Sequence, residues 1–265
     1  MKKRIAIIGG GNLGKSIVEG LLVSEFVTPD EIIITRRNTV SLQPLLEKGV
    51  QVSSDNAMAA SQSDVIILAV KPFQASAVLE TFAHELNPGK LLVSVVTGVL
   101  ISDIENITGN QIPIFRAMPN TAIAIRESMT CTCCNQPALI HMDYVQSLFN
   151  TLGKTVTIQE NLMEAATILG ACGTAYAMRY IRANIQGGIE IGFDAQTASL
   201  IAAQTVKGAA ELLLQHKSHP EEEIDKVTTP KGCTIAGLNE MEHRGFSSSL
   251  IRGIVTSYKK IAKDL

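Results

Sequence analysis

The first residues whose types and spacing point to a definite chemistry form the run Gly9-Gly10-Gly11-Asn12-Leu13-Gly14. The run matches the pattern G-x-G-x-x-G and lies between a short apolar stretch and a segment with helical periodicity, the context in which this pattern binds a dinucleotide. The glycines permit a tight turn, a close approach of backbone to a pyrophosphate, and close packing of helix on strand. The start of the helix then faces the phosphates with free N–H groups. A glycine-rich turn without a ligand is the alternative interpretation. The residues predicted to contact the cofactor here are Gly9, Gly11, Asn12, Leu13 and Gly14.

Two arginines, Arg36 and Arg37, follow the second apolar run. An NAD-selective site places an acidic side chain about 20 residues beyond the glycine run, where it binds the ribose 2′-hydroxyl. Guanidinium groups instead bind a phosphate through paired hydrogen bonds. The sequence therefore predicts NADP(H), with NADPH favoured over NADH. The alternative for either arginine is that it is merely solvated.

Three of the five cysteines lie close together as Cys131, Cys133 and Cys134. This spacing suits neither a disulfide framework nor a paired zinc site, although His141 could be imagined as a fourth ligand. Thiols in a reducing compartment more often act as small apolar side chains. We predict that these cysteines lie in a strand and that the chain has no metal site.

Composition excludes several classes of partner. The chain of 265 residues has 46% apolar and 18% charged residues, with 23 lysines and arginines against 25 acidic residues. This balance gives no global field that would gather nucleic acid or an anionic membrane. The apolar runs are far shorter than the roughly 20 residues that span a bilayer, and Ile5–Ile8 is too short for a signal peptide. We expect a cytoplasmic protein without nucleic-acid or membrane partners.

The elements that would position the glycine run form an alternating pattern. Short apolar runs alternate with helix-like segments such as Leu13–Ser24 and Phe73–Leu86. Strands that are apolar on both faces require helical cover on both sides, which indicates an α/β fold with a Rossmann-like doubly wound sheet. The predicted strands are Arg4–Ile8, Ile32–Thr35, Val65–Val70, Leu91–Val96 and Ile112–Ala117.

Beyond residue 158 the pattern changes to long helical stretches rich in small residues. The sequence predicts an NADP(H)-binding domain over residues 1–158 and an all-helical C-terminal domain over residues 159–265. Asp194 is predicted to cap one helix, Pro220 to begin another and Gly245 to end a third. An apolar stripe from Leu250 to Ile261 is predicted to be core or subunit interface.

Three further motifs follow the glycine run along the chain. They are Ala69-Val70-Lys71-Pro72, Arg116-Ala117-Met118-Pro119-Asn120-Thr121 and Val227-Thr228-Thr229-Pro230-Lys231-Gly232-Cys233-Thr234-Ile235. Together with the glycine run they resemble the pyrroline-5-carboxylate reductase family, over essentially the whole chain. The resemblance implies reduction of the cyclic imine 1-pyrroline-5-carboxylate to L-proline by hydride transfer from NAD(P)H, the last step of proline biosynthesis. It also implies self-association through the helical domain.

The resemblance further implies which residues line the cofactor site. Those on the adenosine and phosphate side are Asn56, Ala69, Val70, Lys71 and Pro72. Those nearer the nicotinamide are Met118, Pro119 and Asn120.

The last motif is similar to the family's substrate loop. Gly232, Cys233 and Thr234 immediately precede a predicted helix, whose free N–H groups favour a carboxylate. By resemblance, Thr234 is the hydroxyl that hydrogen-bonds the imine nitrogen and is the candidate catalytic residue; a plain helix N-cap is the alternative. The predicted substrate-binding residues are Thr229, Lys231, Gly232, Cys233 and Thr234.

Several positions depart from the usual family pattern. Thr174 replaces a proline, Lys231 a glycine, Cys233 a small or hydroxyl residue, and Thr229 a serine. Lys231 adds a positive charge beside the expected carboxylate pocket, although an exposed lysine without a role is the alternative. Two other functions stay open: another two-domain NADP-dependent dehydrogenase, for example one oxidising a β-hydroxy acid, and an inactive nucleotide-sensing homologue.

Overall fold

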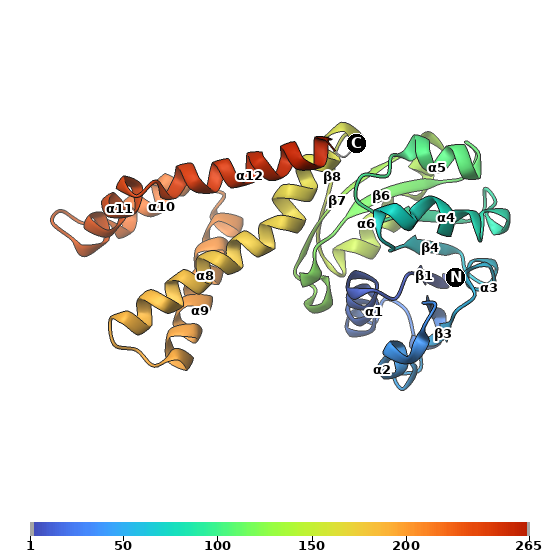
Figure 1. Cartoon of the computed structure of the whole chain (residues 1–265), viewed down its shortest axis with the longest axis horizontal. Coiled ribbons are helices and arrows are strands. Elements are labelled where there is room, and N and C mark those ends of the chain that lie inside the picture. The colour runs from blue at the N-terminus through green and yellow to red at the C-terminus, as the bar shows by residue number, and fades with distance from the viewer. Residues whose placement is uncertain (1–2, 264–265) are drawn as a thin grey trace. The chain divides into compact units, whose positions relative to one another are not determined.

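A computed structural model describes residues 3–263 of the chain, and the N-terminal part folds around one eight-stranded sheet (Figure 1). The strand order is β3-β2-β1-β4-β5-β6-β7-β8, and neighbouring strands are parallel except for the antiparallel pair β6 and β7. The strands are β1 (Ile5–Ile8), β2 (Ile32–Thr35), β3 (Gln51–Ser53), β4 (Val65–Leu68), β5 (Leu91–Ser94), β6 (Ile114–Met118), β7 (Ser128–Cys134) and β8 (Gly153–Thr157). The predicted doubly wound α/β sheet is confirmed.

The central strands are buried on both faces because their residues are apolar throughout. In β1, Ile5 and Ile7 enter one hydrophobic cluster, while Ala6 and Ile8 enter a second cluster on the opposite face. All four side chains are fully buried. Such a strand needs helices on both sides of the sheet.

Helices cover both faces of this sheet (Figure 1). Helices α1 (Asn12–Ser24), α2 (Gln43–Leu46) and α6 (Met142–Asn150) contribute to the first cluster; α3 (Asn56–Ser61), α4 (Ala75–Glu80), α5 (Ile101–Thr108) and α7 (Met163–Ala166) contribute to the second. The segment 73–86, expected to be one helix, is instead α4 with a short 3-10 turn on either side, Pro72–Gln74 and Ala83–Glu85. The second turn begins after Phe82, whose φ of −136° is not helical.

The three cysteines predicted to lie in a strand lie in β7, which confirms that prediction. Cys131 and Cys133 pack on the face of the second cluster, and Cys134 packs on the face of the first. The strand runs antiparallel to β6, with Cys133 opposite Arg116. All five cysteines of the chain are free thiols.

The chain divides into two compact units. The first holds residues up to Cys172 and those from Lys260 onward, and the second holds Gly173–Lys259. By contacts, therefore, the segment 159–172, which includes α7 and a π-helical turn at Thr167–Cys172, groups with the sheet.

The second unit is made of α8 (Gly173–Glu190), α9 (Ala195–His216), α10 (Pro220–Val227), α11 (Cys233–His243) and most of α12 (Phe246–Lys263). The predicted helix ends are confirmed. The Asp194 carboxylate accepts hydrogen bonds from the N–H groups of Gln196 and Thr197, Pro220 is the first residue of α10, and Gly245 follows α11 with a φ of +80°. Within residues 3–263, no helix has the length and apolar character needed to cross a membrane.

Candidate functional site: a dinucleotide cavity and a substrate loop

The glycine run forms the turn from β1 into α1, and its geometry explains two of its glycines. Gly9 has a φ of +117°, and a Cβ atom there would collide with the carbonyl of Ala69 after the neighbouring strand β4. A Cβ atom on Gly14 would collide with the carbonyl of Gly9. Both positions therefore require glycine so that α1 can pack against the ends of β1 and β4.

Gly11 is different, because the space beside it is open. No described atom lies within 4 Å of where its Cβ would be. Gly11 is the N-cap of α1, and among the described residues no side chain caps this helix. The first N–H groups of α1 are thus available to an anion, and the helix dipole favours negative charge there.

A cavity of about 790 Å³ lies in front of this helix start, at the carboxyl ends of β1, β2 and β4. It lies within the first unit and beside the point where the strand order reverses, where doubly wound sheets bind their ligands. The predicted residues that line it are Gly9, Gly11, Asn12, Leu13, Arg36, Arg37, Asn56, Ala69, Val70, Lys71 and Pro72. The predicted residues outside its lining are Gly14, Met118, Pro119 and Asn120.

The two arginines after β2 differ in how they are held. Arg36 donates from Nη1 to the carbonyl oxygen of Gly10 (2.9 Å) and to Oγ of Ser41 (2.6 Å). It therefore also supports the glycine turn. Arg37 is exposed and forms neither a hydrogen bond nor an ion pair with residues 3–263. Its guanidinium group is free to bind a ligand in the cavity.

Asn56 is held at the cavity by two hydroxyl groups. Its Oδ1 accepts from Thr35 Oγ1 (2.7 Å), and its Nδ2 donates to Thr81 Oγ1 (3.1 Å). Thr35 also accepts, through its carbonyl oxygen, the N–H groups of Gly9 and Gly10. The end of β2 thus joins the glycine turn to Asn56.

Thr97 and Thr121 also line the cavity, and sequence reasoning did not select them as site residues. Thr97 follows β5, and its hydroxyl contacts the Met118 sulfur at 4.0 Å. Thr121 follows Asn120, whose side chain donates to the Gly170 carbonyl in the π-helical turn (3.1 Å) and accepts from the Ala122 N–H (3.0 Å). Thr121 belongs to the motif that begins at Arg116, and this motif could have identified it as a site residue. No motif of the sequence contains Thr97.

Burial keeps the thiols of β7 protonated. It raises the pKa values of Cys131 and Cys134, and together with the nearby Glu160 carboxylate it raises the pKa of Cys133 to about 11. A thiol with a raised pKa is a poor nucleophile and a poor metal ligand at neutral pH. The three cysteines therefore behave as small apolar side chains.

The predicted substrate loop lies in the second unit, between α10 and α11. The Gly232 N–H donates to the Thr229 carbonyl (2.9 Å), which closes a turn, and Lys231 within it has a φ of +61°. A Cβ atom on Gly232 would lie 2.6 Å from Thr229 Oγ1. Gly232 itself is the N-cap of α11, so the interpretation of Thr234 as a plain N-cap is wrong. Thr234 is the second residue of that helix, which leaves its hydroxyl free for another role.

The chain was compared with family models, curated proteins and solved structures. Residues 4–98 match a model described as NADP oxidoreductase, coenzyme F420-dependent, and residues 160–264 match one described as pyrroline-5-carboxylate reductase dimerisation. Pyrroline-5-carboxylate reductase 2 of Dictyostelium discoideum is 44% identical over 281 residues, covering 99% of this chain and 93% of the relative. Pyrroline-5-carboxylate reductase 1 of the same organism is 45% identical, and this chain spans 49% of its length.

A solved structure of Plasmodium falciparum pyrroline carboxylate reductase, with NADP bound, is also similar. It has a TM-score of 0.90 at 25% identity and covers 98% of both chains. The doubly wound sheet, the open helix start and the cavity define a dinucleotide-binding protein of the Rossmann class. Within that class, the chain belongs to the pyrroline-5-carboxylate reductase family, and the predicted resemblance is confirmed.

Proposed function

We propose that the chain reduces 1-pyrroline-5-carboxylate to L-proline with NADPH, the last step of proline biosynthesis. The observation that carries the proposal is the 44% identity to a pyrroline-5-carboxylate reductase over 99% of this chain. The dinucleotide cavity and the turn before α11 support it independently, because the reaction needs one site for a nucleotide and one for a carboxylate.

The residues that line the cavity fit NADP(H). The uncapped start of α1 offers N–H groups to the pyrophosphate, and the open side of Gly11 leaves room for it. Arg37, together with Arg36, offers guanidinium groups to the 2′-phosphate at the end of β2. When bound, NADPH supplies the hydride. We place Met118, Pro119 and Asn120 nearer the nicotinamide, because they lie at the end of β6 and just after it, beside the lining residues Thr97 and Thr121.

We assign the substrate to the loop before α11. The free N–H groups of Cys233 and Thr234 would hold the carboxylate at the start of α11, beside Gly232, whose own N–H is bonded to the Thr229 carbonyl. The Thr234 hydroxyl would donate to the imine nitrogen. Lys231 would add positive charge beside the carboxylate, and Thr229 holds the turn closed through its carbonyl. The protein's part in catalysis is then positioning and charge complementarity rather than proton abstraction.

We propose that residues 159–265 form the substrate-binding and dimerisation domain. Among the described residues of Gly173–Lys259, Ala198 and Ala202 are the only apolar residues that are buried. Two alanines are too few to form a hydrophobic core. Large apolar side chains of α8, α9 and α12 remain exposed, among them Met178, Leu200, Leu214, Leu250, Ile251 and Val255. A second copy of the chain would cover them. The free thiols suit a reducing compartment, and we propose the cytoplasm.

The test is to follow NADPH oxidation by the purified full chain with 1-pyrroline-5-carboxylate, and to repeat it with NADH. We expect turnover with NADPH and weaker turnover with NADH. Thr234→Val should lower kcat about 10- to 100-fold, the loss expected when one hydrogen bond to a developing charge is removed. Thr234→Ser, which keeps the hydroxyl, should retain most activity. Absence of turnover with either cofactor would contradict the proposed reaction, whereas an unaffected Thr234→Val variant would contradict only the role of that hydroxyl.

A further inference from the structure

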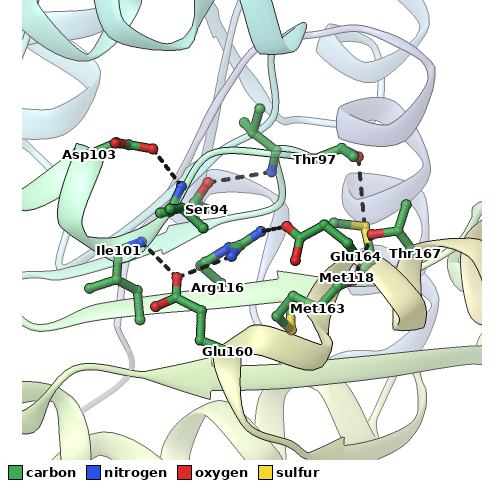
Figure 2. Close-up of polar contacts among 12 residues, drawn as sticks. Ser94, Thr97, Ile101, Asp103, Arg116, Met118, Glu160, Met163, Glu164 and Thr167 are labelled. Carbon is green, nitrogen blue, oxygen red and sulfur yellow. Dashed lines mark hydrogen bonds and ion pairs between the residues drawn. The ribbon is translucent and has the colours of Figure 1, made fainter. Parts of the chain in front are cut away.

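An ion-pair cluster around a buried arginine lies in the first unit, outside the cavity lining. Arg116 of β6 is 1% exposed and lies between two carboxylates (Figure 2). Its Nη1 is 3.0 Å from Glu160 Oε1, and its Nη2 is 3.0 Å from Glu164 Oε1. Sequence reasoning used Arg116 only as part of a motif and did not single out either glutamate.

A contribution to stability does not by itself explain why this cluster is charged. Removing the Arg116 and Glu164 charges from water costs several kcal/mol per ion, and a well-packed apolar group of similar size is often at least as stabilising. Arg116 Nε is buried and has no partner among the described residues, so the guanidinium is not even fully hydrogen-bonded. A role in fixing geometry accounts better for charges in this place.

What the cluster fixes is the segment between β8 and the second unit. Glu160 lies in the 3-10 turn Glu160–Leu162, and its Oε1 also accepts the N–H of Ile101 at the start of α5 (2.7 Å). Glu164 lies in α7, which runs directly into the π-helical turn Thr167–Cys172. Arg116 thereby ties β6 to α5 and to the segment 160–172 (Figure 2).

The same segment holds the end of β6 that borders the cavity. In the π-helical turn, the Gly170 carbonyl accepts the Asn120 side chain. From the other side, the Thr97 hydroxyl contacts the Met118 sulfur. Thr97 and Thr121, the residue after Asn120, both line the cavity. A shift of the segment 160–172 would therefore move this wall of the cavity.

We infer that Arg116, Glu160 and Glu164 are positioning residues that set the nicotinamide end of the cofactor cavity. They act through the π-helical turn and Asn120, without touching the cofactor. The inference rests on the proposed function for what the cavity does. It predicts that loosening the cluster misplaces the hydride donor while leaving the adenosine and phosphate contacts at Gly11 and Arg37 intact.

The experiment compares Glu164→Gln with Asn135→Ala in the full chain. Asn135 holds the opposite end of β6, where it accepts the Ile114 N–H and donates to Glu105 and Ile112, so its loss should destabilise the same strand away from the cavity. For each variant, Tm, the Kd for NADPH, kcat and KM for pyrroline-5-carboxylate are measured. The fluorescence of bound NADPH reports separately on the surroundings of the nicotinamide.

In Glu164→Gln we expect kcat to fall about 10- to 100-fold, the loss that a displacement of about 1 Å can cause. The Kd for NADPH should stay within about threefold of the wild-type value, because the proposed contacts of the cofactor at Gly11 and Arg37 are unchanged. Asn135→Ala should lower Tm but keep kcat. Unchanged kcat in Glu164→Gln, or kcat losses that follow Tm equally in both variants, would overturn the inference.

Two further arms keep the test decisive. If Glu164→Gln does not fold, Glu160→Gln takes its place, because the Glu160 side chain is 34% exposed and its replacement should perturb folding less. If the wild type shows no turnover, the proposed function fails, but the fluorescence still tests the inference. An emission of bound NADPH that changes in the glutamate variant and not in Asn135→Ala supports it, and equal emission in both contradicts it.

Discussion

At the scale of the residue, the backbone conformation of Lys231 shows what it costs to have lysine where the family pattern has glycine. The turn Thr229–Gly232 has Pro230 at its second position and a φ of +61° at Lys231, its third. These are the features of a type II turn, which favours glycine at the third position. The family pattern has glycine there, so this chain holds a side chain in a left-handed conformation that costs about 1 kcal/mol.

Replacing Lys231 with glycine should therefore stabilise the loop. We expect Lys231→Gly to raise the free energy of unfolding by about 1 kcal/mol, because the left-handed conformation no longer strains a Cβ atom. Urea unfolding of the variant and the wild type measures this difference in the free energy of unfolding. The control Lys231→Ala removes the charge but keeps the Cβ atom and should show no gain. A KM for pyrroline-5-carboxylate that rises equally in both variants would identify the charge as the contribution of Lys231 to binding.

Alanine variants of Arg36 and Arg37 should distinguish selection of NADPH over NADH from support of the glycine turn. Arg37 has no partner among residues 3–263, so Arg37→Ala should weaken NADPH binding about 10- to 100-fold and leave NADH binding nearly unchanged. Arg36→Ala should weaken both, because Arg36 also holds the Gly10 carbonyl. Fluorescence titration with each cofactor checks this. Equal losses for both cofactors in Arg37→Ala would show that Arg37 does not select the 2′-phosphate.

At the scale of the element, the strand β7 was harder to predict than its neighbours. Its residues are serine, methionine, threonine and cysteine rather than an apolar run, and it runs antiparallel to β6. The strand β8 is mostly exposed, and β3 is only three residues long with intermediate burial. The apolar pattern that identified β1, β2, β4, β5 and β6 is absent from these three. The strands β3 and β8 are the two edges of the sheet, and β7 carries polar threonine and serine side chains among its buried positions.

Burial of Cys133 in β7 makes stability depend on alkaline pH. Its pKa in the folded chain is about 11, against an ordinary value of 9.0. The folded chain holds the Cys133 proton more tightly than the unfolded chain does. The resulting stabilisation is fully present below pH 9 and is lost as the pH rises from 9 toward 11. Between about pH 8 and about pH 10, we expect the wild type to lose roughly 1 kcal/mol more than Cys133→Ala does.

The measurement is urea unfolding of both proteins at the two pH values. Tyr144, whose pKa is raised to about 12 by burial and by nearby Asp64 and Glu31, is present in both proteins and cancels in the difference. Equal losses in wild type and Cys133→Ala would show that the thiol is not the titrating group.

At the scale of the whole molecule, the two units differ in how they are stabilised. Both hydrophobic clusters lie in the sheet-containing unit, whereas the described apolar side chains of the helical unit are mostly exposed. The stripe on α12 illustrates this, since Leu250, Ile251, Val255 and Tyr258 are each more than two-fifths exposed. Of the two interpretations of this stripe, core or interface, the exposure favours the interface.

A charge placed on that stripe should disrupt self-association. We expect Ile251→Glu to shift the chain to a smaller assembly at micromolar concentration, because a buried unpaired carboxylate is costly at an interface. Sedimentation velocity measures the mass. The control Leu46→Glu introduces the same charge at an exposed leucine of α2 in the other unit and should leave the mass unchanged. A wild type that is monomeric, or an Ile251→Glu variant of unchanged mass, would contradict the proposed interface.

The sequence by itself determined the features that depend on neighbours along the chain. The glycine run, the helix starts at Asp194 and Pro220, and the apolar strands all follow from local sterics, capping and periodicity. The tertiary structure alone decided which distant groups meet. Arg116 pairs with carboxylates 44 and 48 residues away, and Asn120 bonds a carbonyl 50 residues away. Such contacts arise only after the sheet sets its strand order, and a side chain's type does not reveal its partner until then.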